Sequence, residues 1–143
     1  AKQIGSDCSF FINNKPALAL QKGEVLEPVP LSLKGKYIVI VYPNIHISTA
    51  MAYSGVVPNA QGPTIEDLIQ QPIGSWKGTI VNAFEEGIVK QFPVVAEIKN
   101  QLYAAGAIYA SMSGSGSTMF GIFKKEQTPQ LQFPETHLVI KPQ

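Results

Sequence analysis

Asp7 is the first residue whose type and position could do chemistry, since it follows Ile4-Gly5-Ser6 near the start of the chain. A glycine beside a short polar run lets the backbone approach a ligand closely. The Asp7 carboxylate could accept a proton from a substrate hydroxyl, which is the work of a general base. An aspartate in such a place is more often a helix N-cap or a turn residue. The residues alone leave both interpretations open.

A second candidate is a run of alternating glycine and serine between two apolar segments: Ser113, Gly114, Ser115, Gly116 and Ser117. Consecutive backbone N–H groups in such a loop can form a nest for an anion, with the hydroxyls as further donors. The spacing is neither that of a Walker A loop nor that of a dinucleotide-binding fingerprint. A flexible hairpin is an equally good interpretation of the same residues.

A third candidate lies at residues 47–53, where Ser48 is a suitable N-cap for a short helix that begins at Thr49. The aromatic ring of Tyr53, one turn later, could stack on the base of a ligand, as aromatic side chains do in nucleotide-binding sites. Without other information, the better interpretation is that Tyr53 packs this helix against a sheet. His46 has no nucleophile or second metal ligand close by in sequence, which favours a structural role.

Composition excludes several classes of function. The chain of 143 residues has a net charge of +1, and its eleven basic residues are all lysines. Without a polybasic field it is not expected to bind nucleic acid, and no apolar run approaches the ~20 residues of a membrane span. The single cysteine, Cys8, and two distant histidines offer no local metal site. We expect no nucleic-acid or membrane partner, no metal ligands and a cytoplasmic location.

The same residues predict the elements that must position these candidates. Apolar runs and turn residues favour strands at residues 17–20, 24–29, 36–42, 107–111, 118–123 and 137–140. Capping residues and periodicity favour helices at residues 49–54, 64–70, 82–90 and 93–105. The K-Y-I-V-I-V-Y run at 36–42 should be a central strand. This order indicates an α+β fold, an antiparallel sheet with helices on one face, formed by residues 1–143 as a single domain.

Taken together and in this order, the segments resemble the C-terminal half of the 4-diphosphocytidyl-2-C-methyl-D-erythritol kinases, a family of the GHMP superfamily. The resemblance covers nearly the whole chain and is weaker after Lys124. It is carried by I-G-S-D-C-S-F-F (4–11), P-A-L-A (16–19), Y-I-V-I-V-Y-P-N-I-H-I-S-T-A-M-A-Y (37–53), N-A-F-E (82–85), F-P-V-V-A-E-I-K (92–99) and Y-A-S-M-S-G-S-G-S-T-M-F-G-I-F (109–123).

This resemblance implies a ferredoxin-like two-layer fold and an ATP-dependent kinase of the non-mevalonate isoprenoid route. Its small-molecule substrate would be CDP-methylerythritol, phosphorylated on the 2-hydroxyl. Asp7 matches the family's catalytic aspartate, Tyr53 an aromatic that stacks on the cytosine, and Thr49 a residue of the same substrate-facing turn. Residues 113–117 match the Gly-rich loop beside the phosphates and the substrate.

Two departures from the family's pattern matter. Ala83 stands where the family has aspartate in the N-D-[FL]-E motif, which we expect to be mainly structural. The family's catalytic lysine, glycine-rich phosphate loop and second cytosine-stacking aromatic belong to an N-terminal half that this sequence does not contain. We therefore expect a piece of a longer enzyme whose missing N-terminal domain is its partner and holds most of ATP with Mg²⁺. Alone, the chain should be inactive.

Two other interpretations remain open at this point. The chain could come from another GHMP small-molecule kinase, such as a homoserine or mevalonate-type enzyme, although Tyr53 and the residues around Asp7 argue against it. It could also be a non-catalytic, ferredoxin-like binding module, in which Asp7 has no function. Replacement of Asp7 in the full-length protein separates these classes.

Overall fold

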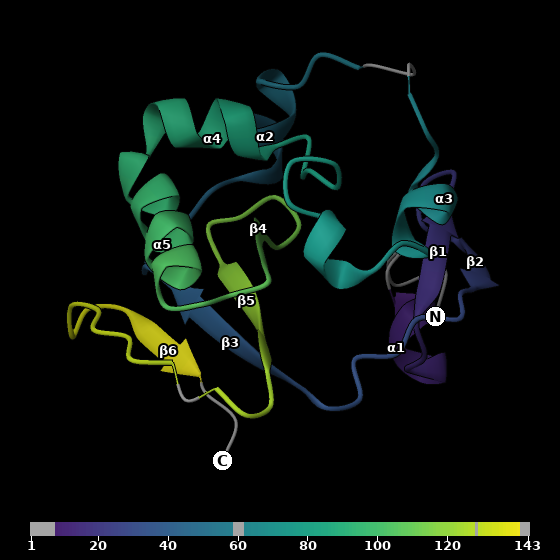
Figure 1. Cartoon of the computed structure of the whole chain (residues 1–143). Coiled ribbons are helices and arrows are strands. Elements are labelled where there is room, and N and C mark those ends of the chain that lie inside the picture. The colour runs from purple at the N-terminus through teal and green to yellow at the C-terminus, as the bar shows by residue number, and fades with distance from the viewer. Residues whose placement is uncertain (1–7, 59–61, 128, 141–143) are drawn as a thin grey trace.

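The computed structural model describes residues 8–58, 62–127 and 129–140, and a four-stranded antiparallel sheet forms its centre (Figure 1). The strands run in the order β4-β5-β3-β6 across the sheet. Their bounds are Lys36–Tyr42 for β3, Tyr109–Met112 for β4, Met119–Lys124 for β5 and Leu138–Ile140 for β6.

Strand β3 is central, as its sequence predicts. Its β-branched and aromatic residues suit a pleated surface with neighbours on both sides. It pairs with β5 along almost its whole length, with Val39 opposite Gly121, and with β6 at its end, with Val41 opposite Val139. The strand ends at Tyr42, because Pro43 cannot donate a further ladder hydrogen bond.

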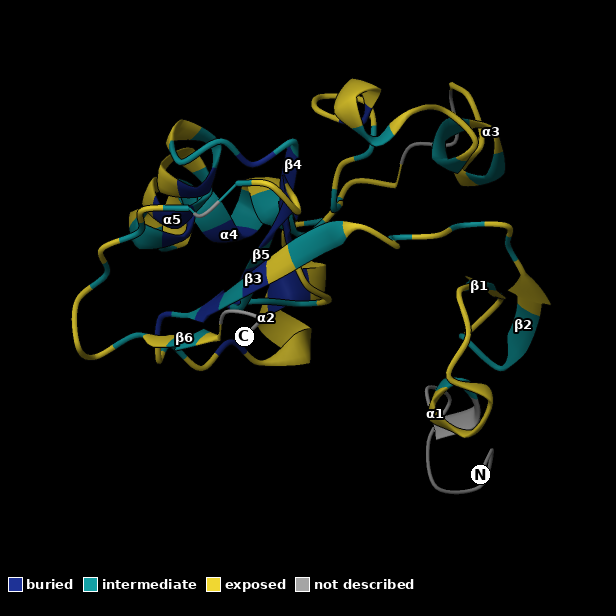
Figure 2. Ribbon diagram, turned by 60° about the horizontal axis from the view of Figure 1, so that its bottom comes forward, coloured by how far each residue is buried: buried dark blue, intermediate teal, exposed yellow. Residues whose placement is uncertain are grey.

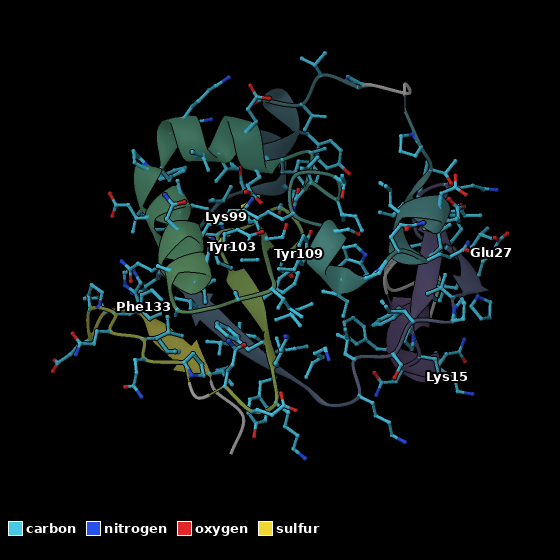
Figure 3. The ribbon with its side chains drawn as sticks, in the orientation of Figure 1. Lys15, Glu27, Lys99, Tyr103, Tyr109 and Phe133 are labelled. Carbon is cyan, nitrogen blue, oxygen red and sulfur yellow. The ribbon has the colours of Figure 1, made fainter. Side chains whose placement is uncertain are left out.

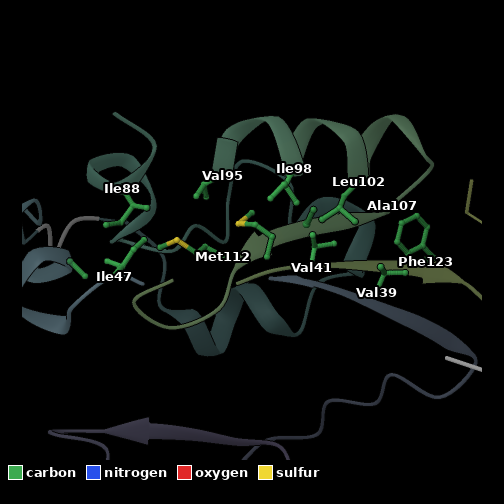
Figure 4. Close-up of a cluster of buried hydrophobic side chains, with 13 residues drawn as sticks. Val39, Val41, Ile47, Ile88, Val95, Ile98, Leu102, Ala107, Met112 and Phe123 are labelled. Carbon is green, nitrogen blue, oxygen red and sulfur yellow. The ribbon is translucent and has the colours of Figure 1, made fainter. Parts of the chain in front are cut away.

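Helices α4 (Glu85–Gln91) and α5 (Pro93–Ala104) lie together over one face of this sheet (Figure 1). The buried residues of α5, Val95, Ile98 and Leu102, recur at helical spacing and point at the sheet (Figure 4). There they join Val39, Val41 and Phe123 in one apolar core. An α+β fold with an antiparallel sheet and helices packed on it is therefore confirmed.

The opposite face of the sheet is covered at its β4–β5 end. Trp76 packs edge-on against Tyr109, with ring centroids 5.5 Å apart, and both join Ile122 in a second, smaller core. Trp76 follows a short 3₁₀ helix, η1 (Ile73–Ser75), which the sequence did not predict. Towards β6 the same sheet exposes apolar side chains, among them Leu138.

A small hairpin unit precedes the sheet in the chain. Helix α1 (Cys8–Asn13) is followed by strands β1 (Ala17–Leu20) and β2 (Val25–Pro28), which pair only with each other. The strands lie where the sequence predicts them. Figure 2 shows this unit apart from the buried centre of the molecule, with most of its residues exposed or half-buried.

Most of the predicted helix caps are confirmed. Helix α2 (Thr49–Ser54) begins after Ser48, whose hydroxyl oxygen accepts from the Met51 N–H at 3.2 Å. Helix α3 (Ile65–Ile69) begins with a capping box between Thr64 and Asp67. Helix α4 departs from the prediction: it begins at Glu85, because the Asn82 side chain accepts from the Phe84 N–H in a turn that precedes the helix. None of the helices among the described residues is long and apolar enough to span a membrane.

Candidate functional site

The glycine–serine loop of residues 113–117 joins β4 to β5 as a folded turn. The Ser113 N–H donates to the Thr118 carbonyl at 2.8 Å, and the Gly116 N–H donates to the Ser113 carbonyl at 3.0 Å. Gly114 and Gly116 both have positive φ, at 55° and 88°, a region that glycine enters without steric penalty. Within the described part of the chain, the neighbouring N–H groups of Gly114 and Ser115 donate to no acceptor. These two donors are able to bind an anion.

The far end of this loop is tied to the segment before α2. Ser117 is buried, at 1% exposure, and its hydroxyl donates to the Ile45 carbonyl at 2.5 Å. The two residues are 72 positions apart in the chain. This contact joins the loop to the connection between β3 and α2.

The near end of the loop is held by Asn82. Its side-chain amide donates to the carbonyls of Met112 and Gly114, both at 2.8 Å, while its carbonyl oxygen accepts from the Phe84 N–H at 2.9 Å. One side chain therefore bridges the turn before α4 and the start of the loop.

Glu85 and Lys99 extend this network beneath the loop. The Glu85 carboxylate accepts from the Met112 N–H at 3.1 Å and from the Ser111 hydroxyl at 3.3 Å, and it forms an ion pair with Lys99. The side chains of Glu85 and Lys99 are only 12% and 27% exposed. In Figure 3 Lys99 and Tyr103 lie on the side of α5 that faces β4. A partly buried, hydrogen-bonded pair is less screened than a fully exposed surface pair.

Tyr53 lies on the outer side of α2. The residue is 63% exposed, and the edge-to-face partner of its ring is Phe84, with centroids 4.9 Å apart and an interplanar angle of 73°. The interpretation that Tyr53 packs the helix against the sheet is wrong, because Ala52 is the buried residue of α2. Thr49, at the start of the same helix, is exposed. The exposed face of the Tyr53 ring is free to receive a flat ligand group.

Short contacts connect Tyr53 to the loop. The Tyr53 ring contacts Phe84, the Phe84 N–H donates to Asn82, and Asn82 donates to Gly114. The structure thus brings together two of the candidate segments that the sequence indicated, the stacking aromatic and the glycine–serine loop.

Asp7 and the segment 4–7 lie outside the described residues. Helix α1, which follows them in sequence, lies with β1 and β2 on the side of the molecule away from α2 and α4 (Figures 1 and 2). The expected meeting of Asp7 with the glycine–serine loop therefore stays a prediction.

Sequence reasoning assigned a structural role to residues 82–85 but did not find their partners. Asn82 and Glu85 contact residues about 30 positions away, and no local pattern indicates such a pairing.

Beside this network a cleft of about 490 Å³ opens between α4 and α5, and its lining includes Asn82, Glu85 and Lys99. Among the described residues, no group of three or more His, Cys, Asp or Glu side chains could hold a metal ion.

Comparison with protein families gives a match to the C-terminal domain of the GHMP kinases over residues 64–132. Among curated proteins, a 4-diphosphocytidyl-2-C-methyl-D-erythritol kinase from Azobacteroides pseudotrichonymphae is 49% identical over 130 residues, which are 90% of this chain and 49% of that protein. One from Bacteroides fragilis is 45% identical, over 87% of this chain and 45% of that protein. The chain spans about half the length of the curated relatives it matches.

Two solved structures of kinases also resemble this chain. A crystal structure of a 4-(cytidine 5'-diphospho)-2C-methyl-D-erythritol kinase matches with a TM-score of 0.67 and 28% identity, over 84% of this chain and 45% of that one. A homoserine kinase from Cytophaga hutchinsonii matches with a TM-score of 0.52 at 17% identity, over 77% of this chain and 39% of that one. The second match shows a common fold only.

Proposed function

We propose, from the premise that residues 64–132 form a GHMP kinase C-terminal domain, that this chain is the substrate-side half of a small-molecule kinase. The enzyme would transfer the γ-phosphoryl group of MgATP to the 2-hydroxyl of 4-diphosphocytidyl-2-C-methyl-D-erythritol. An N-terminal half, of the size that the relatives have beyond this match, would complete it.

The observation that carries the proposal is the exposed Tyr53 ring, held by Phe84 and linked through Asn82 to the glycine–serine loop. A cytosine would stack on Tyr53, and Thr49 would lie on the same side of α2. The loop would offer the Gly114 and Ser115 N–H groups and its hydroxyls to phosphate oxygens. Backbone donors suit this work because the chain has no arginine to provide a bidentate fork.

Asp7 would act on the reacting hydroxyl, as a general base or by orienting the oxygen for in-line attack. MgATP supplies the phosphoryl group, and most of its contacts would come from the N-terminal half. Phosphoryl transfer depends on positioning and charge neutralisation around the nucleotide. The isolated chain should therefore be inactive, and the complete enzyme is proposed to act in the cytoplasm on the non-mevalonate isoprenoid route.

The test is release of ADP by the full-length protein in the presence of CDP-methylerythritol, with homoserine and mevalonate as matched alternative substrates. Turnover with one of those two instead would assign another GHMP kinase. The variant Asp7→Asn should lower kcat by about 10²–10⁴-fold and leave substrate binding nearly unchanged. Unchanged turnover in this variant would favour a non-catalytic role for Asp7.

A second measurement concerns the isolated chain. Isothermal titration with MgATP should give no binding in the micromolar range, because the nucleotide's main contacts would be absent. Micromolar binding would show that this half holds the nucleotide by itself and would contradict the proposed division of the site.

A further inference from the structure

Met112, the last residue of β4, is held by side chains at both of its backbone polar groups. Its N–H donates to the Glu85 carboxylate at 3.1 Å, and its carbonyl accepts from the Asn82 amide at 2.8 Å. The residue lies directly before the glycine–serine loop. One side chain from the turn before α4 and one from the first residue of α4 therefore hold the end of this strand.

Asn82 reaches past Met112 into the loop itself. Its amide nitrogen also lies 2.8 Å from the Gly114 carbonyl oxygen and donates its second hydrogen to it, so the two carbonyls that flank Ser113 converge on one nitrogen. The carbonyl and N–H of Gly114 belong to adjoining peptide groups. The Ser115 N–H shares a peptide group with the Gly114 carbonyl, so fixing that carbonyl fixes the direction of this donor and restricts the neighbouring Gly114 N–H.

The loop needs such restraint because of its composition. Glycine has more backbone freedom than any other residue, and Gly114 has nothing within 4 Å of where a Cβ would be. A donor pair that must be ordered when the ligand arrives loses part of its binding free energy to that ordering. The network of Asn82, Glu85 and Lys99 restrains the loop before any ligand is bound.

We propose that Asn82 and Glu85 are positioning residues that hold the glycine–serine loop in its ligand-binding conformation, with Lys99 orienting Glu85. This inference rests on the proposed function and assigns a role in it to the N-A-F-E segment. Neither side chain needs to touch the substrate, since both act through the backbone of residues 112–114.

Asn82→Asp is the most discriminating variant. Aspartate keeps the oxygen that accepts from the Phe84 N–H, but it lacks the two N–H groups that donate to the Met112 and Gly114 carbonyls. An added carboxylate oxygen would also face two carbonyls. Helix α4 should keep its start while the loop is released. Glu86→Gln is the matched control, since Glu86 neighbours Glu85 but pairs with Lys90 on the exposed surface.

Two measurements on the full-length protein follow. Amide hydrogen exchange at Ser113 and Gly116 should accelerate roughly tenfold or more in Asn82→Asp, because two hydrogen bonds are lost, whereas Val39 in β3 should not change. Turnover should fall about 10²-fold, the effect of displacing a reacting group by about 1 Å. KM for the cytidine substrate should rise by a smaller factor than kcat falls, because stacking on Tyr53 is kept while the loop donors must be ordered on binding. Glu86→Gln should behave as wild type in both.

Lys99→Ala with small amines provides an independent test. The cleft of about 490 Å³ is lined by both Glu85 and Lys99, so ethylammonium can reach the unpaired carboxylate. Millimolar ethylammonium should restore turnover in Lys99→Ala and slow the exchange of the Met112 N–H again. Lys90→Ala, which breaks the exposed pair on α4, should show neither loss nor rescue.

The outcomes separate this inference from the proposed function. If the wild-type protein phosphorylates no substrate, the exchange measurements still show whether the network holds the loop. Unchanged exchange at Ser113 and Gly116 in Asn82→Asp would overturn the anchoring. Faster exchange with wild-type kcat would overturn the positioning role and leave the kinase proposal intact. A rise in KM alone would show that Asn82 serves binding rather than positioning for the reaction.

Discussion

Gly55 and Gly87 face each other where the end of α2 lies against α4. A Cβ on either glycine would lie 3.2 Å from the Cα atom of the other. Only two residues without side chains allow the backbones to approach so closely. Since α2 carries Tyr53 and α4 begins with Glu85, this contact sets the position of the aromatic relative to the loop network.

Gly87→Ala should separate these two helices. Alanine favours a helix interior by about 1 kcal/mol over glycine, but an extra methyl group in a packed contact costs about 1–3 kcal/mol. We expect a small net loss of unfolding free energy in urea and a clear change in the NMR shifts of the Tyr53 and Phe84 rings. Gly74→Ala is the control, because nothing lies within 4 Å of its Cβ position. Unchanged ring shifts in Gly87→Ala would refute the contact.

Gly116→Ala and Gly114→Ala should differ in effect although both residues have positive φ. The left-handed conformation costs a residue with a side chain about 1–2 kcal/mol. At Gly116 the Cβ would also lie 2.5 Å from the sulfur of Met112, which is only 2% exposed, whereas at Gly114 the space is open. Urea unfolding should show the larger loss for Gly116→Ala. Equal losses would mean that Met112 moves aside freely.

Tyr53→Ala should weaken binding of the cytidine substrate to the full-length protein. Stacking of a base on an aromatic side chain contributes about 1–3 kcal/mol, so Kd should rise roughly 5-fold to 150-fold. Since Tyr53 is 63% exposed, the unfolding free energy should fall by only about 1 kcal/mol through the lost contact with Phe84. Tyr53→Phe should retain wild-type affinity; titration calorimetry with CDP-methylerythritol measures both variants.

Tyr109 should make the stability fall at high pH. Burial raises the pKa of its hydroxyl above the ordinary value of about 10, and the hydroxyl donates to the Ile80 carbonyl at 3.0 Å. The folded state therefore holds this proton more tightly than the unfolded state. The stabilising contribution of the protonated Tyr109 hydroxyl is complete at pH values below the pKa of this hydroxyl in the unfolded chain. It is lost as the pH rises from that pKa through the higher pKa of the folded state.

The measurement for Tyr109 is urea unfolding between pH 8 and about pH 11. The wild-type free energy of unfolding should decline more steeply above pH 10 than that of Tyr109→Phe. At neutral pH the variant should be about 1 kcal/mol less stable, because it lacks the hydrogen bond to Ile80. Parallel curves for the two proteins would contradict the burial of this hydroxyl.

Features whose cause lies within a few residues could be predicted from the sequence. The Ser48 and Thr64 caps accept from N–H groups three residues away, and both helices begin as expected. Strand 36–42 is recognisable from its β-branched and aromatic residues alone. The caps have their partners within three residues, and the strand is indicated by residue types that favour an extended backbone whatever its partners are.

Features that depend on distant partners could not be predicted. Helix α4 starts at Glu85 and not at Asn82, and the Asn82 amide donates to a loop 32 residues away. The 3₁₀ turn before Trp76 forms where that ring packs on Tyr109 across the sheet. The exposure of Tyr53 follows from Ala52 occupying the buried position of α2. The residue types do not indicate which distant residue each of these side chains contacts, because that depends on how the helices and loops pack on the sheet.

The bond from the buried Ser117 hydroxyl to the Ile45 carbonyl has a consequence for selectivity. It joins the connection leading into α2 to one end of the loop. Under the proposed function, this bond would fix the spacing between the stacking ring and the loop donors. The site would then favour a ligand whose base and phosphates match that spacing over a shorter or longer one.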